Sequence, residues 1–197
     1  MTILIKNGRL INPSENLDKV MDIFVEDGII KEKAESIEKQ ADTVIDAAGC
    51  YVMPGLIDLH VHFRDPGLTY KEDIETGSKA AAKGGFTTVC CMPNTKPVVD
   101  NVETVKYIIE KGEKTGLTNV LPVGAVTKNM AGVEITDVEE LKKAGICAIS
   151  EDGKSVMNSG VYRKAMKNAA KANVPVLAHC EDINLVEGGV INLGDKS

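Results

Sequence analysis

The sequence predicts an α/β fold with parallel strands, preceded by a small antiparallel β element. Three observations support this prediction. From residue 52 onward, apolar strand-like runs recur about every thirty residues, the length of one βαβ unit. Helical patterns of apolar residues lie between these runs. Near the start, Asn7-Gly8 and Asp27-Gly28 each separate two β-forming runs, and both dipeptides favour the positive φ angles of two-residue hairpin turns.

We expect two domains: a β-strand segment at 1–52, forming part of a small β-sandwich, and an α/β part at 53–197. The five expected strands are YVMPGLIDLHVHF, FTTVCCMP, NVLPVGAV, ICAIS and VPVLAHC. The helix signals are an apolar face at Val102, Val105, Ile108 and Ile109, a capping box at Thr136 and Glu139, a helical pattern after Ser159, and helix ends at Gly84-Gly85 and Gly145. Five such units make either a complete doubly wound sheet or the first part of an eight-stranded barrel, and composition does not decide between them.

Composition excludes several classes of partner. The chain has 197 residues, 43% of them hydrophobic, enough for one ordinary domain or for part of a larger one. Its net charge of -6 and the lack of a Lys/Arg block argue against nucleic-acid and anionic-membrane partners. No run reaches the ~20 apolar residues of a membrane span, and the N-terminus lacks a signal-peptide layout, so we expect a cytoplasmic protein. The five cysteines show no CxxC spacing, which predicts free, buried thiols.

The first α/β strand holds two of the three histidines in the chain. Because alternate residues of a strand point to the same side, Asp58, His60, His62 and Arg64 are expected on one face. Two imidazoles at positions i and i+2 can chelate one cation where the strand ends. The alternative is a histidine pair hydrogen-bonded in a core, but an acid and an arginine on the same face favour a metal site, with Asp58 supporting the ligands.

Other strand ends add polar groups to the same edge of the sheet. Glu151 and Asp152 follow the fourth strand, His179 ends the fifth, and Asn94 lies after the second. The carboxyl ends of parallel strands converge, so these groups can meet the first histidine pair. Each also has a plain structural alternative: a turn for Asp152 and Asn94, and a core histidine for His179. Cys180 is not expected to act as a nucleophile with His179, since neighbours on a strand face opposite sides.

Four stretches together resemble a known family: PGLIDLHVHFRDPG, YKEDIETGSKAAAKGGFTTVCCMPNTKP, SEDG and LAHCED. They are similar to the amidohydrolase superfamily and, within it, to class I (long-type) bacterial dihydroorotase. The resemblance implies the first five βα units of a TIM-type (β/α)8 amidohydrolase barrel, with two zinc ions per complete site. It implies His60 and His62 on one zinc, Asp152 bridging both and His179 on the second. His62, Arg64 and Asn94 are implied to hold the substrate carboxylate.

The implied reaction is the reversible hydrolysis of the cyclic amide of dihydroorotate to N-carbamoyl-aspartate, a step of pyrimidine biosynthesis. Two other functions stay open: a related cyclic amidase of the allantoinase or hydantoinase type, and a non-catalytic dihydroorotase-like assembly partner. Hydantoinase-like enzymes bridge their metals with a carboxylated lysine. The lysine near the bridging position here, Lys154, is expected to be solvent-exposed, and Asp152 takes the bridging role.

The resemblance also implies two groups that residues 1–197 do not supply: a further histidine ligand and an aspartate that acts as general base. A (β/α)8 barrel typically needs about 250 residues. We therefore expect the chain to be the N-terminal part of an enzyme, truncated after the fifth strand, with an open strand edge and no activity alone. Expected partners are the small-molecule substrate and one of three proteins: a separate C-terminal part, a second copy in a homodimer, or another pyrimidine-pathway enzyme.

Overall fold

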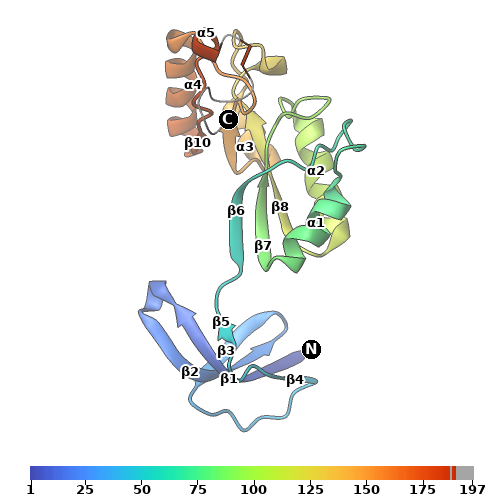
Figure 1. Ribbon diagram of the computed structural model, residues 1–197, viewed down its shortest axis with the longest axis vertical. Helices are drawn as coiled ribbons and strands as arrows, with labels where there is room; N and C mark the ends of the chain where they lie inside the picture. The colour runs from blue at the N-terminus through green and yellow to red at the C-terminus, as the bar shows by residue number, and fades with distance from the viewer. Residues whose placement is uncertain (187, 190–197) are drawn as a thin grey trace, which may run out of the picture. The chain divides into compact units, whose positions relative to one another are not determined.

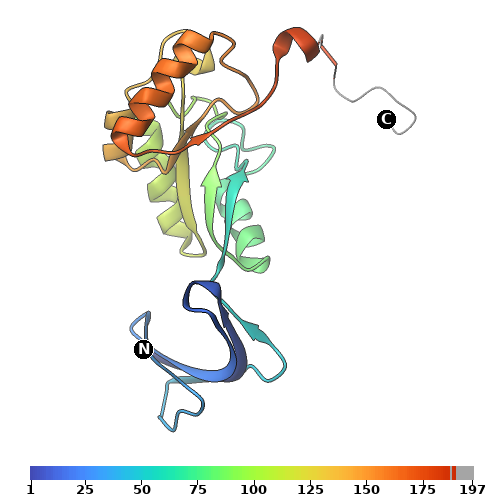
Figure 2. The same ribbon diagram turned by 90° about the vertical axis from the view of Figure 1, so that its left-hand side faces the viewer.

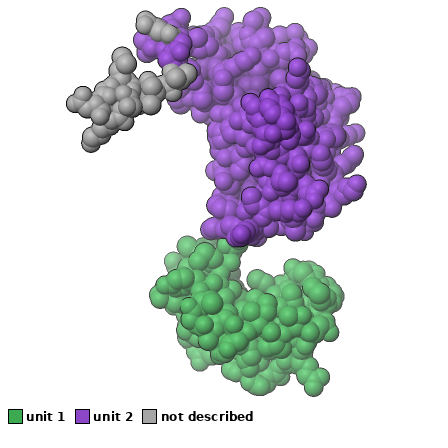
Figure 3. Space-filling model, turned by 45° about the vertical axis from the view of Figure 1, so that its right-hand side comes forward, with its two compact units in different colours: residues 1–55 green, residues 56–197 purple. Residues whose placement is uncertain are grey.

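The computed structural model describes residues 1–186 and 188–189. It divides into two compact units, Met1–Gly55 and Leu56–Ser197 (Figure 3). Each unit has its own sheet and its own buried apolar residues.

The first unit is a mixed five-stranded sheet rather than the purely antiparallel element expected. Its elements are β1 (Thr2–Asn12), a 3-10 turn η1 (Pro13–Glu15), β2 (Leu17–Glu26), β3 (Ile29–Ala34), β4 (Thr43–Asp46) and β5 (Tyr51–Val52). The strands run in the order β3-β2-β1-β4, and β5 also pairs with β1. Pairing is antiparallel for β1 with β2 and β2 with β3, but β4 and β5 lie parallel to β1.

The two predicted hairpin turns have different outcomes. Asp27-Gly28 joins β2 to β3 with φ angles of 50° and 75°, as predicted. The prediction for Asn7-Gly8 is wrong, because β1 continues through it with only an irregularity in its pairing. The reason is a long-range contact: the Asn7 backbone N–H donates to the buried carboxylate of Asp22 at 2.9 Å, which satisfies the bulged residue without a turn.

The second unit alternates strands and helices. Its strands are β6 (Leu56–Val61), β7 (Phe86–Cys91), β8 (Asn119–Ala125), β9 (Ala148–Ser150) and β10 (Val176–Leu177). The helical segments are α1 (Ile74–Lys83), α2 (Val102–Thr115), the 3-10 turn η2 (Lys128–Met130), α3 (Val138–Ala144), α4 (Ser159–Ala172) and α5 (Ile183–Val186). All five strands are parallel and pair in chain order, from β6 through to β10 (Figures 1 and 2).

This order separates the two architectures that composition left open. A doubly wound sheet reverses its strand order at a switch point and carries helices on both faces. Here the order does not reverse, and α1 packs against α2, α2 against α3, and α3 against α4. Helices in one continuous row along a sequentially ordered parallel sheet are the arrangement of a barrel wall.

Both faces of this wall are apolar, as parallel sheets require. On β7, Val89 and Cys91 pack into the cluster beneath the helices, whereas Cys90 belongs to a second cluster with Val123 and Ala148. All five cysteines are free; Cys90 and Cys91 are buried and Cys147 is half-buried. The expectation of buried thiols is wrong for Cys50 and Cys180, which are exposed.

Helix caps were only partly predictable. Gly84 and Gly145 lie at the ends of α1 and α3, as predicted. The expected capping box at Thr136 is wrong, because its hydroxyl donates to a strand carbonyl at 2.8 Å, and Asp137 caps α3 instead. Helix α4 begins at Ser159, with Asn158 as its N-cap. No helix in the described part of the chain has both the length and the apolar character of a membrane span.

Candidate metal centre

The two neighbouring histidines lie where β6 ends. Asp58 and His60 are in the strand, and His62 follows its last residue, Val61. The Asp58 carboxylate accepts a hydrogen bond from the His60 backbone N–H at 3.0 Å, and strand pairing is irregular from Asp58 to Val61. The Nε2 atoms of His60 and His62 lie 3.3 Å apart, so both rings face one point. The strand itself ends at Val61, before the predicted alternation reaches Arg64, where a left-handed turn with a φ of 59° begins.

Asp152 completes this group from the far end of β9. It is 5% exposed, and its Oδ1 and Oδ2 atoms lie 3.3 Å from His60 Nε2 and His62 Nε2 respectively. One ligand atom from each of the three residues lies within 4.8 Å of the others. Two ligand atoms on a tetrahedral zinc ion with bonds of 2.0–2.1 Å are about 3.4 Å apart. The spacing and the donor types of this triad therefore fit a zinc ion.

Asp152 lies in a turn, as one interpretation predicted, and it also lies beside the two histidines; its role as a metal ligand stays a prediction. Gly153 has a φ of 81°, and the Lys154 N–H donates to the Glu151 carbonyl at 2.9 Å, which closes a turn. The Glu151 side chain is buried away from the triad and accepts hydrogen bonds from the Thr127 backbone N–H, at 3.0 Å, and from the Thr127 hydroxyl. Lys154 is exposed and donates to a backbone carbonyl, so it does not belong to the triad.

His179 approaches the same carboxylate from β10. Its Nδ1 lies 3.3 Å from Asp152 Oδ1, and its Nε2 lies 2.8 Å from a Glu181 carboxylate oxygen. With its proton on Nε2, the ring donates to Glu181 and turns the Nδ1 lone pair toward Asp152. Glu181 was not among the predicted site residues. Its spacing of two from His179, on the same side of an extended segment, was the available signal.

Asn94 links His62 to Asp152 through its side-chain amide. It follows β7 and its Oδ1 lies 3.0 Å from His62 Nδ1, while its Nδ2 donates to Asp152 Oδ2 at 3.2 Å. His62 can therefore keep its proton on Nδ1 and leave Nε2 free as a ligand. A guanidinium nitrogen of Arg64 lies 3.5 Å from the same Asn94 oxygen.

The charges around His62 favour its ligand form. Burial lowers the pKa of His62, the hydrogen bond with Asn94 raises it, and the positive charge of Arg64 lowers it again. The net pKa lies below the ordinary value, so the imidazole is neutral at pH 7, the state that binds metals.

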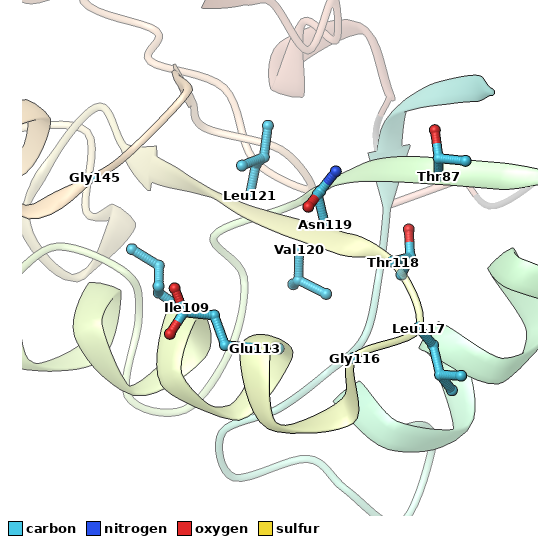
Figure 4. A pocket seen from close by; sticks show the side chains of 11 residues that line it. Thr87, Ile109, Glu113, Gly116, Leu117, Thr118, Asn119, Val120, Leu121 and Gly145 are labelled. Atoms are coloured by element: carbon cyan, nitrogen blue, oxygen red, sulfur yellow. The ribbon is translucent and has the colours of Figure 1, made fainter. Parts of the chain in front are cut away.

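A hollow of about 520 Å³ lies elsewhere, where α2 ends and β8 begins (Figure 4). It is lined by backbone and by residues such as Thr87, Glu113 and Asn119. It contains none of the residues of the histidine group, and Glu113 is the one acidic or basic side chain in its lining. It therefore offers no acid–base pair and no metal-binding group.

Known proteins resemble this chain at the level of sequence. A family model described as "Dihydro-orotase-like" matches residues 49–195. The chain is 49% identical over 198 residues to a dihydroorotase from Pelobacter propionicus, covering 100% of the chain and 47% of the relative. It is 50% identical over 197 residues to a dihydroorotase from Aquifex aeolicus, covering 100% of the chain and 46% of the relative. The chain thus spans less than half the length of the curated relatives that it matches.

Solved structures confirm the architecture. An L-hydantoinase (dihydropyrimidinase) from Arthrobacter aurescens matches with a TM-score of 0.77 and 25% identity, over 94% of this chain and 42% of that one. A D-hydantoinase from a Thermus species matches with a TM-score of 0.73 and 30% identity, over the same shares. The sequential parallel sheet is therefore the first five βα units of an amidohydrolase barrel, as predicted. Because the family model matches about three quarters of its length, the chain belongs to the dihydroorotase-like family.

Proposed function

We propose that this chain supplies the metal ligands and the substrate-carboxylate site of a zinc-dependent dihydroorotase, which interconverts dihydroorotate and N-carbamoyl-aspartate in pyrimidine biosynthesis. One observation carries the proposal: a carboxylate oxygen of Asp152 lies 3.3 Å from a ring nitrogen of each of His60, His62 and His179. The identity of about 50% to proteins named dihydroorotase supports the choice of substrate.

His60, His62, Asp152 and His179 would hold the metal. Asp152 Oδ1 lies near ring nitrogens of His60 and His179 and Oδ2 lies near His62, so this one carboxylate is within reach of all three imidazoles. Bound zinc would polarise the amide carbonyl and lower the pKa of water toward about 7. Removing zinc with a chelator should abolish turnover, and metal analysis should find two ions per complete site.

The substrate carboxylate would be held by Arg64 and Asn94, with His62 beside them. The planar guanidinium of Arg64 can meet both carboxylate oxygens. The Asn94 amide contacts both His62 and Asp152, so it can keep the carboxylate-binding groups in register with the metal ligands. These residues orient the ring so that its amide carbonyl approaches the metal ligands.

The test is Arg64→Met in the protein carrying this sequence, with kcat and KM measured for dihydroorotate. A lost charge-assisted contact of about 1.5–3 kcal/mol predicts a KM increase of roughly tenfold to a hundredfold. Arg163→Met is the matched control, because Arg163 is exposed on α4. An unchanged KM in Arg64→Met would remove Arg64 from the substrate site.

A cyclic amidase of the hydantoinase type is the second candidate, since hydantoinase structures match the fold at 25% and 30% identity. Assays with dihydroorotate, hydantoin and allantoin in parallel separate the two. Faster turnover of hydantoin or allantoin than of dihydroorotate would show that the protein is a cyclic amidase of the other type. A protein that binds no zinc and turns over none of the three would instead indicate a non-catalytic assembly partner.

A further inference from the structure

The backbone at Arg64 is held in an uncommon conformation. Its φ of 59° lies in the left-handed region, which costs a residue with a side chain roughly 1–3 kcal/mol at such a position. The turn it begins is closed by a hydrogen bond from the Leu68 N–H to the Arg64 carbonyl at 2.9 Å. One local hydrogen bond offsets only part of that cost. Contacts from elsewhere in the fold must maintain the turn that directs the guanidinium.

The next residue, Asp65, provides such contacts. Asp65 is 2% exposed, and its Oδ1 accepts a hydrogen bond from the Tyr107 hydroxyl at 2.9 Å. Its Oδ2 lies 2.5 Å from Lys111 Nζ and 3.4 Å from the Ile74 backbone N–H. A buried carboxylate without partners is strongly unfavourable, so its position follows its donors. Two of these donors are side chains of α2, outside the candidate site.

The far side of the same loop is fastened to the Asn94 loop. The Lys96 backbone N–H donates to the Pro66 carbonyl at 3.0 Å. Gly67 approaches the Lys96 carbonyl so closely that a Cβ there would lie 1.8 Å from its oxygen. The loop bearing Arg64 is therefore fixed at one side by α2 and at the other by the segment that carries Asn94.

We propose that Tyr107 and Lys111 are positioning residues: by holding Asp65, they maintain the left-handed turn at Arg64 and direct its guanidinium to the substrate carboxylate. The inference rests on the proposed function, in which Arg64 binds that carboxylate. A merely structural ion pair would also stabilise the fold. It would not, however, change the environment of the Arg64 side chain or the affinity for substrate.

Arginine side-chain NMR tests the first step without any ligand. In the protein carrying this sequence, the Arg64 Nε–Hε signal is assigned as the one lost in Arg64→Lys. Tyr107→Phe removes one hydroxyl, and Lys111→Met keeps the aliphatic stem. We expect both to move the Arg64 signal alone. Lys106→Met, an exposed lysine on the same helix, is the control and should move none.

Kinetics with dihydroorotate tests the second step. Loss of one hydrogen bond to Asp65 should raise KM roughly threefold to tenfold in Tyr107→Phe and in Lys111→Met, with the bound zinc unchanged. An Arg64 signal that stays in place in both variants overturns the proposal. So does an unchanged KM in both variants when Arg64→Met raises it. If Arg64→Met leaves KM unchanged, the proposed role of Arg64 in substrate binding has failed, whatever its signal shows.

Discussion

Replacing Gly77 by alanine should destabilise the fold and displace the Phe63 ring, which adjoins the candidate site. Gly77 lies in α1 against the ring of Phe63, which is 6% exposed and stands between His62 and Arg64 in the chain. An added Cβ would lie 2.4 Å from two ring carbons, whereas carbon atoms pack at about 3.5–4.0 Å, so the ring must withdraw by more than about 1 Å. Overpacking costs about 1–3 kcal/mol, and alanine recovers about 1 kcal/mol of helix propensity. At so short a distance we expect the upper range, a net loss of about 2 kcal/mol.

The measurement is a double-mutant cycle by urea unfolding, with Phe63→Leu as the second substitution. Leucine removes the ring carbons that the new methyl group meets, so Gly77→Ala should be neutral or stabilising in that background. The coupling between the two sites should then be about 2–3 kcal/mol. Zinc affinity should also fall in Gly77→Ala alone, because the displaced ring adjoins His62. Equal losses in both backgrounds, within about 0.5 kcal/mol, would refute the contact.

Three further predictions concern other parts of the chain. The Ser78 hydroxyl is buried and has no hydrogen-bond partner among the residues that the structure describes, so Ser78→Ala should raise the free energy of unfolding by about 1 kcal/mol; a lower urea midpoint would contradict this. Burial raises the pKa of Asp22, but hydrogen bonds from two backbone N–H groups more than offset this, and the net pKa lies below its ordinary value. Its stabilisation is therefore present above about pH 4 and lost as pH falls through the lower folded pKa. Acid unfolding of Asp22→Asn should lack this dependence, and an unaltered curve would count against it. Burial also raises the pKa of the Cys91 thiol, so a disulfide reagent should modify exposed Cys50 and Cys180 rapidly and Cys91 only after unfolding. Rapid modification of Cys91 in the folded protein would show that it is not buried.

The sequence predicted the parts of the site that depend on strand geometry. Alternation along β6 placed His60 and His62 together, and the convergence of parallel strand ends brought in Asp152 and His179. These rules succeed because parallel pairing in chain order determines where each strand end lies, and local periodicity identifies the strands. The assignment of Arg64 and Asn94 to the substrate came from family resemblance and stays a prediction.

The remaining features depend on contacts between distant residues, which no local pattern encodes. Asn7-Gly8 has the chemistry of a hairpin turn, but a carboxylate 15 residues away satisfies its N–H and the strand continues. Thr136 has the spacing of a capping residue, but a strand carbonyl 11 residues away takes its hydroxyl. The contact of Tyr107 with Asp65 spans 42 residues. In each case the polar group is satisfied by a partner that is distant in the sequence.

Glu151 and Asp152 show how such competition is decided at the site itself. Both are nearly fully buried carboxylates in adjacent positions, and a sequence pattern cannot distinguish which of them reaches the histidines. The structure directs Glu151 to the backbone N–H and hydroxyl of Thr127, at the end of the neighbouring strand β8. With that carboxylate fully occupied and the turn at Gly153 closed, Asp152 faces the opposite side, toward His60 and His62. The hydrogen bonds between Glu151 and Thr127 thus decide that Asp152, and not Glu151, is the carboxylate that faces the histidines.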